Sequence, residues 1–203
     1  MEIIFPILIL LLSVVIHEVS HGFVAYFLGD PTAKLAGRLT LNPIKHLDPI
    51  GSVLIPLLTY TTGGFIFGWA KPVPYNPYNL KAGRWGPAYV AVAGPAANFV
   101  VAAFFSALIR LAAAGLALPQ TFLELSTLVV LLNLILAIFN LFPIPPLDGS
   151  KILFSFLPYR YRWLEEWLNR YQLILIMVLL FFLWRAILPL VGFLFRLFTG
   201  LTI

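Results

Sequence analysis

The sequence has no cysteine among its 203 residues. This absence excludes disulfide bonds, thiolate metal ligands and cysteine nucleophiles, so any metal site or catalytic group must use other side chains. Histidine is also scarce, with three in the chain, and charged residues make up only 10% of it. The chemistry of this protein therefore rests on a small number of polar side chains.

The low charge excludes a soluble domain. Hydrophobic residues make up 61% of the chain, and the mean hydropathy is +0.97. Such a composition is typical of an integral membrane protein, whose first partner is the lipid bilayer. The net charge of +5 is modest and is spread over loops, so it indicates membrane topology, and we expect no nucleic-acid partner.

Long apolar segments predict an all-α polytopic membrane protein with about five to six transmembrane helices, forming a single domain over residues 1–203. The predicted helices cover about 3–28, 88–114, 122–142 and 172–199. The last of these is either one long tilted helix or two short helices that break near 185–189, where Arg185 and Pro189 lie.

Residues 50–67 form a further apolar segment that is poorly suited to a regular spanning helix. It contains Gly51, Pro56, Gly63 and Gly64. Irregular backbone at membrane depth is tolerated where it is buried in protein or lines a wet cavity. We therefore expect a re-entrant or β-like membrane-associated segment after the first helix, with an ordinary spanning helix as the alternative.

The basic residues predict the orientation of the chain. Residues 112–123 contain no Lys or Arg. Residues 29–87 contain six, namely Lys34, Arg38, Lys45, Lys71, Lys81 and Arg84. Short basic loops stay in the cytoplasm. The N-terminus is therefore expected outside and residues 143–171 inside, provided that 50–67 does not cross the membrane completely.

The first apolar segment contains the motif His17-Glu18-Val19-Ser20-His21. Four residues advance a helix by about 400°, so His17 and His21 lie on one face and can bind a single metal through their imidazole nitrogens. Glu18 projects beside them and is suited to activate water as a general base. Because these groups are costly in hydrocarbon, the motif predicts a zinc hydrolase whose site lies within the membrane.

A third protein ligand is needed, since catalytic zinc usually has three. His46 lies between Lys45 and Asp48, and we assign it to a headgroup or turn position. Asp148 is the stronger candidate because the prolines of 143–146 end the preceding helix, and an extended segment would carry Asp148 toward the site. In the predicted topology, His17, His21 and Asp148 all come to the cytoplasmic side.

Three motifs make the chain resemble the site-2 protease family of intramembrane zinc metalloproteases, in particular its compact prokaryotic members without PDZ or CBS domains. They are His17-Glu18-x-x-His21, Gly94-Pro95-Ala96-Ala97-Asn98, and Asn140 followed by Pro143-x-Pro145-x-Leu147-Asp148-Gly149. The stretch from Gly37 to Gly51 is also similar to these members.

The resemblance implies one zinc ion per chain, held by His17, His21 and Asp148, with Glu18 as general base. Asn98 and Asn140 are implied near the substrate or the oxyanion. The implied substrates are single-span membrane proteins, cut within or near the span in regulated intramembrane proteolysis. The implied location is a prokaryotic inner membrane, and the chain is a possible homo-oligomer.

Two other functions remain open at this stage. A membrane metal transporter would also place His, Asp and Asn within the bilayer, but it needs polar residues across the full thickness, and Pro6 to Leu12 are wholly apolar. A noncatalytic relative that binds membrane proteins is the other alternative, and the intact Glu18 argues against it.

Overall fold

The computed structural model describes residues 4–48, 51, 54, 61 and 71–201. Within this part of the chain all regular structure is helical, and no β-strand occurs. The α-helices are α1 (Ile4–Phe27), α2 (Thr32–Leu35), α4 (Gly86–Ala113), α5 (Gln120–Asn140), α6 (Asp148–Phe156), α7 (Arg162–Arg170), α8 (Gln172–Val178) and α9 (Trp184–Thr199). Single 3-10 turns cover Pro43–His46, Pro77–Asn79, Gly83–Trp85 and Tyr159–Tyr161.

Three helices among the described residues are long and apolar enough to cross a membrane, namely α1, the helix that ends at Ala113, and α5. The 24 residues of α1 extend over about 36 Å, which exceeds a hydrocarbon core of about 30 Å. These helices confirm the predictions at 3–28, 88–114 and 122–142. The predicted re-entrant segment 50–67 lies outside the described residues, apart from three isolated positions, and stays a prediction.

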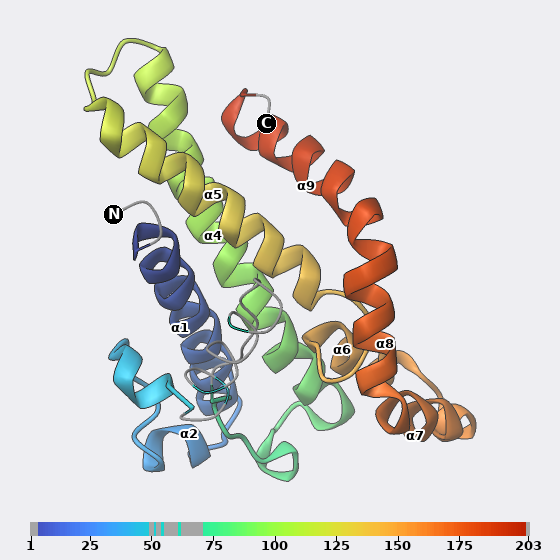
Figure 1. The fold of residues 1–203 in the computed structure, drawn as a ribbon. Coiled ribbons are helices and arrows are strands. Elements are labelled where there is room, and N and C mark those ends of the chain that lie inside the picture. Colours follow the sequence, from blue (N-terminus) through green and yellow to red (C-terminus); the bar gives the residue numbers. More distant parts are fainter. Residues whose placement is uncertain (1–3, 49–50, 52–53, 55–60, 62–70, 202–203) are drawn as a thin grey trace.

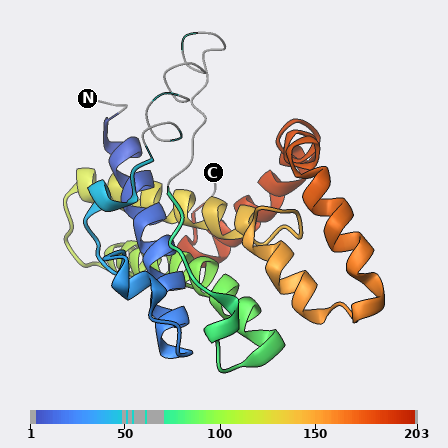
Figure 2. The ribbon, with the colours of Figure 1, turned by 90° about the horizontal axis from the view of Figure 1, so that it is seen from below.

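The helix α4 is the centre of the molecule. It packs against α1 and α5 and also contacts α6 and α9. Figures 1 and 2 show α1 on one side of the α4–α5 pair and α8 and α9 on the other side. The largest buried apolar cluster joins α4, α5 and the C-terminal helices, and its members include Ala102, Val130, Leu134, Leu179 and Val191. The other side of α4 faces α1, where the polar residues of the first motif lie.

The C-terminal stretch is helical over its whole length but is not one regular α-helix. A π-helical turn over Leu179–Leu183 separates α8 from α9. The sequence left open one long helix or two helices that break near 185–189. The irregular turn begins six residues before that range, and Pro189 lies inside α9. The helix tolerates the missing backbone N–H of Pro189. The π-helical turn at 179–183 contains no proline, so proline content does not predict it.

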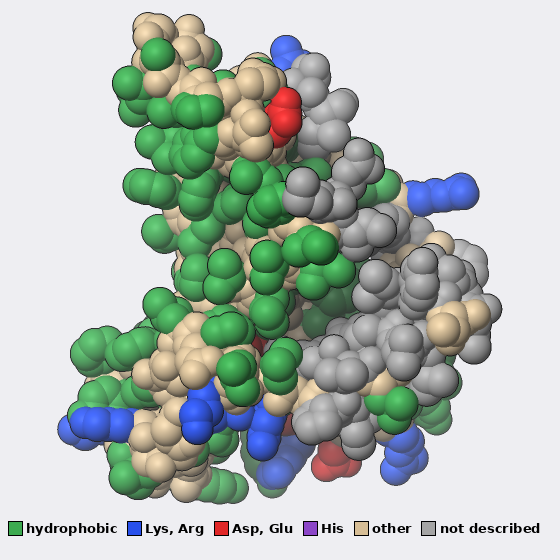
Figure 3. All heavy atoms as spheres, turned by 60° about the vertical axis from the view of Figure 1, so that its left-hand side comes forward, with side chains coloured by type: hydrophobic (Ala, Val, Ile, Leu, Met, Phe, Trp, Pro, Cys, Tyr) green, Lys and Arg blue, Asp and Glu red, His purple; other side chains and the backbone are tan. Residues whose placement is uncertain are grey.

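Hydrophobic side chains cover the middle of the face in Figure 3, and several Lys and Arg side chains lie along its lower edge. This lower end is where α1 finishes and α4 begins, and Figure 1 places α2 and α7 there as well. An apolar belt with a charged end agrees with helices that stand in a bilayer.

Candidate metal and catalytic site

The α1 helix brings His17 and His21 onto one face, as the spacing predicts. Their rings meet edge to face, with centroids 4.7 Å apart, and both residues are buried. The buried side of α1 also contains Ser13, Val15 and Val19, so this face packs against other helices. The two imidazoles therefore lie inside the protein rather than in lipid.

Gly94 of α4 gives the histidines their space. A Cβ atom at this position would lie 2.5 Å from Nε2 of both His17 and His21. Such a contact is far too short for unbonded atoms, so only glycine lets α4 approach the imidazole pair this closely. The glycine of Gly94-Pro95 is thus a packing requirement of the site.

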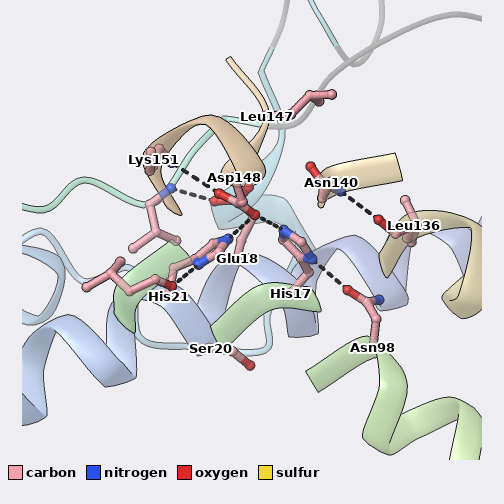
Figure 4. A network of polar contacts seen from close by, with 12 residues as sticks. His17, Glu18, Ser20, His21, Asn98, Leu136, Asn140, Leu147, Asp148 and Lys151 are labelled. Carbon is pink, nitrogen blue, oxygen red and sulfur yellow. Dashed lines mark hydrogen bonds and ion pairs between the residues drawn. The ribbon is translucent and has the colours of Figure 1, made fainter. Parts of the chain in front are cut away.

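Asp148 reaches the histidines from the far end of the chain. Residues 141–147 run as a series of turns, not as the extended segment predicted, because the prolines there force repeated changes of direction. Asp148 then begins α6, and its Oδ2 lies 3.0 Å from His17 Nε2 and 3.1 Å from His21 Nε2. Figure 4 shows the three side chains pointing toward one another.

Gly149 is required for this placement. A Cβ atom there would lie 2.2 Å from the carbonyl oxygen of Leu141 and 2.4 Å from that of Phe142. Because these are backbone atoms, they cannot move aside as a side chain would. The glycine that follows Asp148 therefore allows the start of α6 to lie directly on the end of α5.

The orientation of each imidazole is fixed through its Nδ1 atom. His17 Nδ1 lies 2.6 Å from Asn98 Oδ1, and His21 Nδ1 lies 2.7 Å from the carbonyl oxygen of Val90. Both partners are acceptors, so each Nδ1 carries the proton and donates. In the neutral rings both Nε2 lone pairs then face Asp148, which is the arrangement of metal-ligating histidines with outer hydrogen bonds.

The three residues fit a zinc ion. One ligand atom from each of His17, His21 and Asp148 can be chosen so that all lie within 4.8 Å of one another, and all three residues are buried. Two imidazole nitrogens and a carboxylate oxygen are a common catalytic zinc set. Electron-rich atoms at about 3 Å also repel one another unless a cation or an additional proton lies between them, so the donor set itself indicates a cation.

A polar chain continues from His17 into the helix bundle. Asn98 Nδ2 donates to Asn133 Oδ1 at 2.7 Å, and Asn133 Nδ2 donates to Ser13 Oγ at 2.9 Å. Asn98 and Asn133 are completely buried. Sequence reasoning placed Asn98 near substrate or oxyanion. Its position here, with both ends of the amide bonded to protein, suits orientation of His17.

Glu18 lies beside the three candidate ligands (Figure 4), and its carboxylate is held by backbone. The amide N–H of Val73 donates to Glu18 Oε2 at 2.8 Å. Gly22 permits this approach, since a Cβ atom there would lie 2.8 Å from Val73 Cγ1 and 2.6 Å from Leu39 Cδ2. The segment from residue 71 therefore lies directly against the motif helix.

The same segment is anchored at two other points. The amide of Lys71 donates to the carbonyl of His46 at 2.9 Å, and Arg38 donates to the carbonyl of Lys71. His46 is completely buried and its Nε2 lies 2.8 Å from the carbonyl of Thr40. This is the turn role predicted for His46, in a protein interior rather than at lipid headgroups, and His46 is not part of the three-residue metal group.

Asp30, just after α1, holds the segment at a second point, residues 76–79. Its buried carboxylate accepts hydrogen bonds from the Thr32 backbone and hydroxyl, the Asn76 backbone and the Asn79 side chain. Burial alone would raise the pKa of Asp30, but these hydrogen bonds outweigh it and hold the pKa below its ordinary value. The ionised carboxylate thus clamps the end of α1 to residues 76–79.

Lys151 is a site residue that sequence reasoning missed. Its Nζ lies 3.1 Å from Asp148 Oδ1, the oxygen that does not face the histidines, and 5.9 Å from the ring centroid of Tyr75. The signal in the sequence is its spacing, because residues three apart on a helix are neighbours. Asn133 and Val73 were also missed. Asn133 is an asparagine within an apolar helix, and Val73 contributes only its backbone N–H, so no sequence motif marks either residue.

Asn140 lies at the end of α5 and is half-buried. Its Nδ2 donates to the Leu136 carbonyl of its own helix at 3.0 Å (Figure 4). Unlike Asn98, it makes no hydrogen bond to His17 among the contacts of the described residues.

Comparisons with known proteins agree with this geometry. The sequence family described as Peptidase family M50 matches residues 5–123 and 106–184. "Putative zinc metalloprotease YwhC" of Bacillus subtilis (strain 168) is 41% identical over 157 residues, which are 75% of this chain and 68% of that protein. "Putative zinc metalloprotease Rip2" of Mycolicibacterium smegmatis is 34% identical over 147 residues, or 68% of this chain.

The match covers 52% of the Mycolicibacterium protein, so the chain spans about half the length of that relative. No solved structure matches the chain. The family match nevertheless extends over most of the chain, from α1 to the start of α9, and includes all the residues of the site. The chain therefore belongs to peptidase family M50, the site-2 protease family of membrane metalloproteases.

Proposed function

We propose that this protein is an intramembrane zinc metalloendopeptidase that hydrolyses peptide bonds within or near the transmembrane segments of single-span membrane proteins. The observation that carries the proposal is the convergence of His17, His21 and Asp148 beside Glu18, in the second half of an apolar helix. Family membership and the names of the relatives support the same chemistry.

One zinc ion per chain is proposed at the three ligands. When bound there, zinc would polarise a substrate carbonyl and increase the acidity of water. Glu18 would take a proton from the attacking water and return it to the leaving amide nitrogen as the peptide bond breaks. The Val73 N–H keeps the Glu18 carboxylate oriented for both transfers, since it fixes one oxygen at 2.8 Å.

The neighbouring residues hold these groups in place. Asn98, backed by Asn133, fixes the tautomer and direction of His17, and the Val90 carbonyl does the same for His21. Lys151 holds one oxygen of Asp148, so the other oxygen faces the histidines. We assign a substrate contact to Asn140, because it is half-buried beside the site and its side chain needs only to turn from Leu136.

The proposed substrates must expose backbone to reach Glu18. A transmembrane helix keeps its carbonyls in hydrogen bonds that hydrocarbon preserves, so local unwinding precedes cleavage. We place the site toward the cytoplasm of a prokaryotic inner membrane, with the N-terminus outside. The basic residues at the end of the bundle that carries the site support this orientation. Self-association is a further proposal.

Cleavage of a model single-span substrate tests the proposed function. The purified protein is placed in liposomes, zinc is quantified per chain, and wild type is compared with Glu18→Gln and Asp148→Ala. We expect Glu18→Gln to retain zinc and to lose activity by about 10²- to 10⁴-fold, the usual contribution of a general base. Asp148→Ala should lose both zinc and activity.

Glu124→Gln is the matched control, because it makes the same substitution at an exposed position of α5. It should cleave as wild type does. Cleavage by Glu18→Gln at the wild-type rate would overturn the assignment of the base. Metal uptake into vesicles that depends on His17 and Asp148, without any cleavage, would favour the transporter instead.

A further inference from the structure

A hollow of about 300 Å³ lies between the residues that precede α4 and the turn that joins α6 to α7. Arg84 borders it from the α4 side, and Tyr159, Tyr161 and Arg162 border it from the other side. Phe154 and Leu157 supply an apolar wall. The hollow thus combines two guanidinium groups and two phenol hydroxyls with an apolar border.

The two arginines are available to a ligand. Among the described residues, neither arginine lies within ion-pair distance of a carboxylate. Arg84 instead lies over the Trp85 ring at 4.7 Å, and Arg162 lies over the Tyr159 ring at 5.6 Å. Stacking uses the face of a guanidinium and leaves its N–H edge toward other partners. The edge of Arg162 already interacts with the Tyr159 hydroxyl and lies near Glu165 and Glu166, but its five N–H donors leave some for an oxyanion.

The charge of the hollow favours an anion. Glu165 also lines it and opposes Arg162 from the next turn of α7. Two guanidinium groups against one carboxylate leave a net charge of +1. Arginine forks match the geometry of phosphate oxygens, and phenol hydroxyls can donate to the remaining oxygens.

The position of the hollow points to the membrane surface. It lies at the end of the molecule where α4 begins, next to α7 (Figure 1). Trp163 and Trp167 lie one turn apart on α7 and are 61% and 46% exposed, and Tyr171 continues the same face. Exposed aromatic residues of this kind mark the headgroup region of a bilayer, with the polar side of the helix toward water.

The walls of the hollow are held together. The rings of Trp85 and Phe156 meet edge to face at 4.9 Å, which joins the residue before α4 to the last residue of α6. A ligand in the hollow would add a second connection between segments that are about 75 residues apart in the chain. Such a ligand would therefore stabilise the contact between α4 and the helix that begins with Asp148.

We propose that this hollow binds the phosphate group of an anionic phospholipid. Arg84 and Arg162 hold the phosphate oxygens, Tyr159 and Tyr161 donate their hydroxyls, and the apolar wall accommodates the glycerol and the first carbons of the acyl chains. The cytoplasmic leaflet supplies such lipids, and basic pockets at this depth recognise their headgroups. The assignment is independent of the protease reaction.

Native mass spectrometry of the purified chain in neutral detergent tests the site, with phosphatidylglycerol and phosphatidylcholine as probes. We expect one tightly retained lipid and about tenfold preference for phosphatidylglycerol. The double variant Arg84→Gln/Arg162→Gln should lose this preference. Lys45→Gln/Arg170→Gln removes the same charge from exposed positions outside the hollow and should keep it.

Three results would overturn the proposal. Wild type without a lipid preference would do so, and so would an equal loss in both double variants, because general attraction to charge would then explain binding. Displacement of lipid by millimolar inorganic phosphate, with the same dependence on Arg84 and Arg162, would assign the hollow to a soluble phosphate compound. A Tyr159→Phe variant, in which both arginines remain, should weaken lipid retention without changing thermal unfolding.

Discussion

Individual residues without reactive groups set the geometry of the candidate metal site. Gly94 and Gly149 leave the space that the imidazoles and α6 occupy, and Asn98 fixes the direction of His17. The candidate ligands themselves were predicted from the sequence motifs. These supporting residues, in contrast, are defined by contacts between segments that are far apart in the chain, so a single sequence indicates their presence but not their role.

Gly94→Ala tests the space beside the histidines. Alanine is the better helix former, so α4 should persist, but the new Cβ would meet both Nε2 atoms at 2.5 Å. We expect zinc content and cleavage to fall at least tenfold, as measured by metal analysis and substrate cleavage. Gly192→Ala, at a position with no atom within 4 Å of the new Cβ, should leave both unchanged. Full zinc loading of Gly94→Ala would contradict this account.

Lys151→Gln tests the hold on Asp148. Without the ammonium group, Asp148 Oδ1 loses its partner at 3.1 Å and the carboxylate is free to turn. We expect zinc affinity to fall by about 10- to 100-fold, the usual effect of losing an outer partner of a ligand, as measured by competition with a chelator. Lys151→Arg should retain most of the affinity. The exposed Lys45→Gln serves as control, and an unchanged Kd in Lys151→Gln would refute the role.

The segment from residue 71 to residue 79 connects the elements around the site. Asp30 clamps its far end to α1, while Val73 contacts Glu18 nearer its start. The segment is attached to the end of α1 through the buried carboxylate of Asp30. From the sequence alone, Asp30 would be assigned to an ordinary surface turn.

Asp30→Asn should destabilise the protein at neutral pH. The amide nitrogen would face the N–H of Asn76, where the carboxylate now accepts, and leave a buried donor unpaired. We expect a cost of about 1–3 kcal/mol, measured by thermal unfolding in detergent. Glu124→Gln, the corresponding change of a carboxylate to an amide at an exposed site, should cost little.

The effect should depend on pH. Because the native pKa of Asp30 lies below the ordinary value of 3.8, its stabilisation is complete above that value and is lost as the pH falls through the native pKa. The difference between wild type and Asp30→Asn should therefore shrink in acid. A difference that grows on acidification would show that the carboxylate is not the stabilising form.

At the scale of the whole molecule, hydropathy predicted to within two residues at each end the three helices that are long and apolar enough to span a membrane, because burial in lipid requires long continuous apolar runs. The short helices of 143–171 were not predicted. They are shorter than α1 and mix aromatic with charged residues, so neither length nor apolar periodicity marks them. The re-entrant segment stays a prediction.

The absence of cysteine makes the topology easy to test. Ala117→Cys lies in the turn between α4 and α5, and Lys45→Cys lies in the basic region after α1. In intact bacterial cells that express each variant, we expect a membrane-impermeant maleimide to label Ala117→Cys only. The parent chain, which has no thiol, gives the background. Labelling of Lys45→Cys alone would invert the proposed orientation.

Proline at positions 72 and 74 has no backbone N–H, so Val73 is the one residue of 72–74 that can donate to Glu18. A slip of the segment by a single residue in either direction would place a proline opposite the carboxylate, and no hydrogen bond would form. The sequence Pro-Val-Pro thus fixes the register of this segment relative to Glu18. It selects one alignment of the segment on α1 by leaving the two adjacent alignments without a donor.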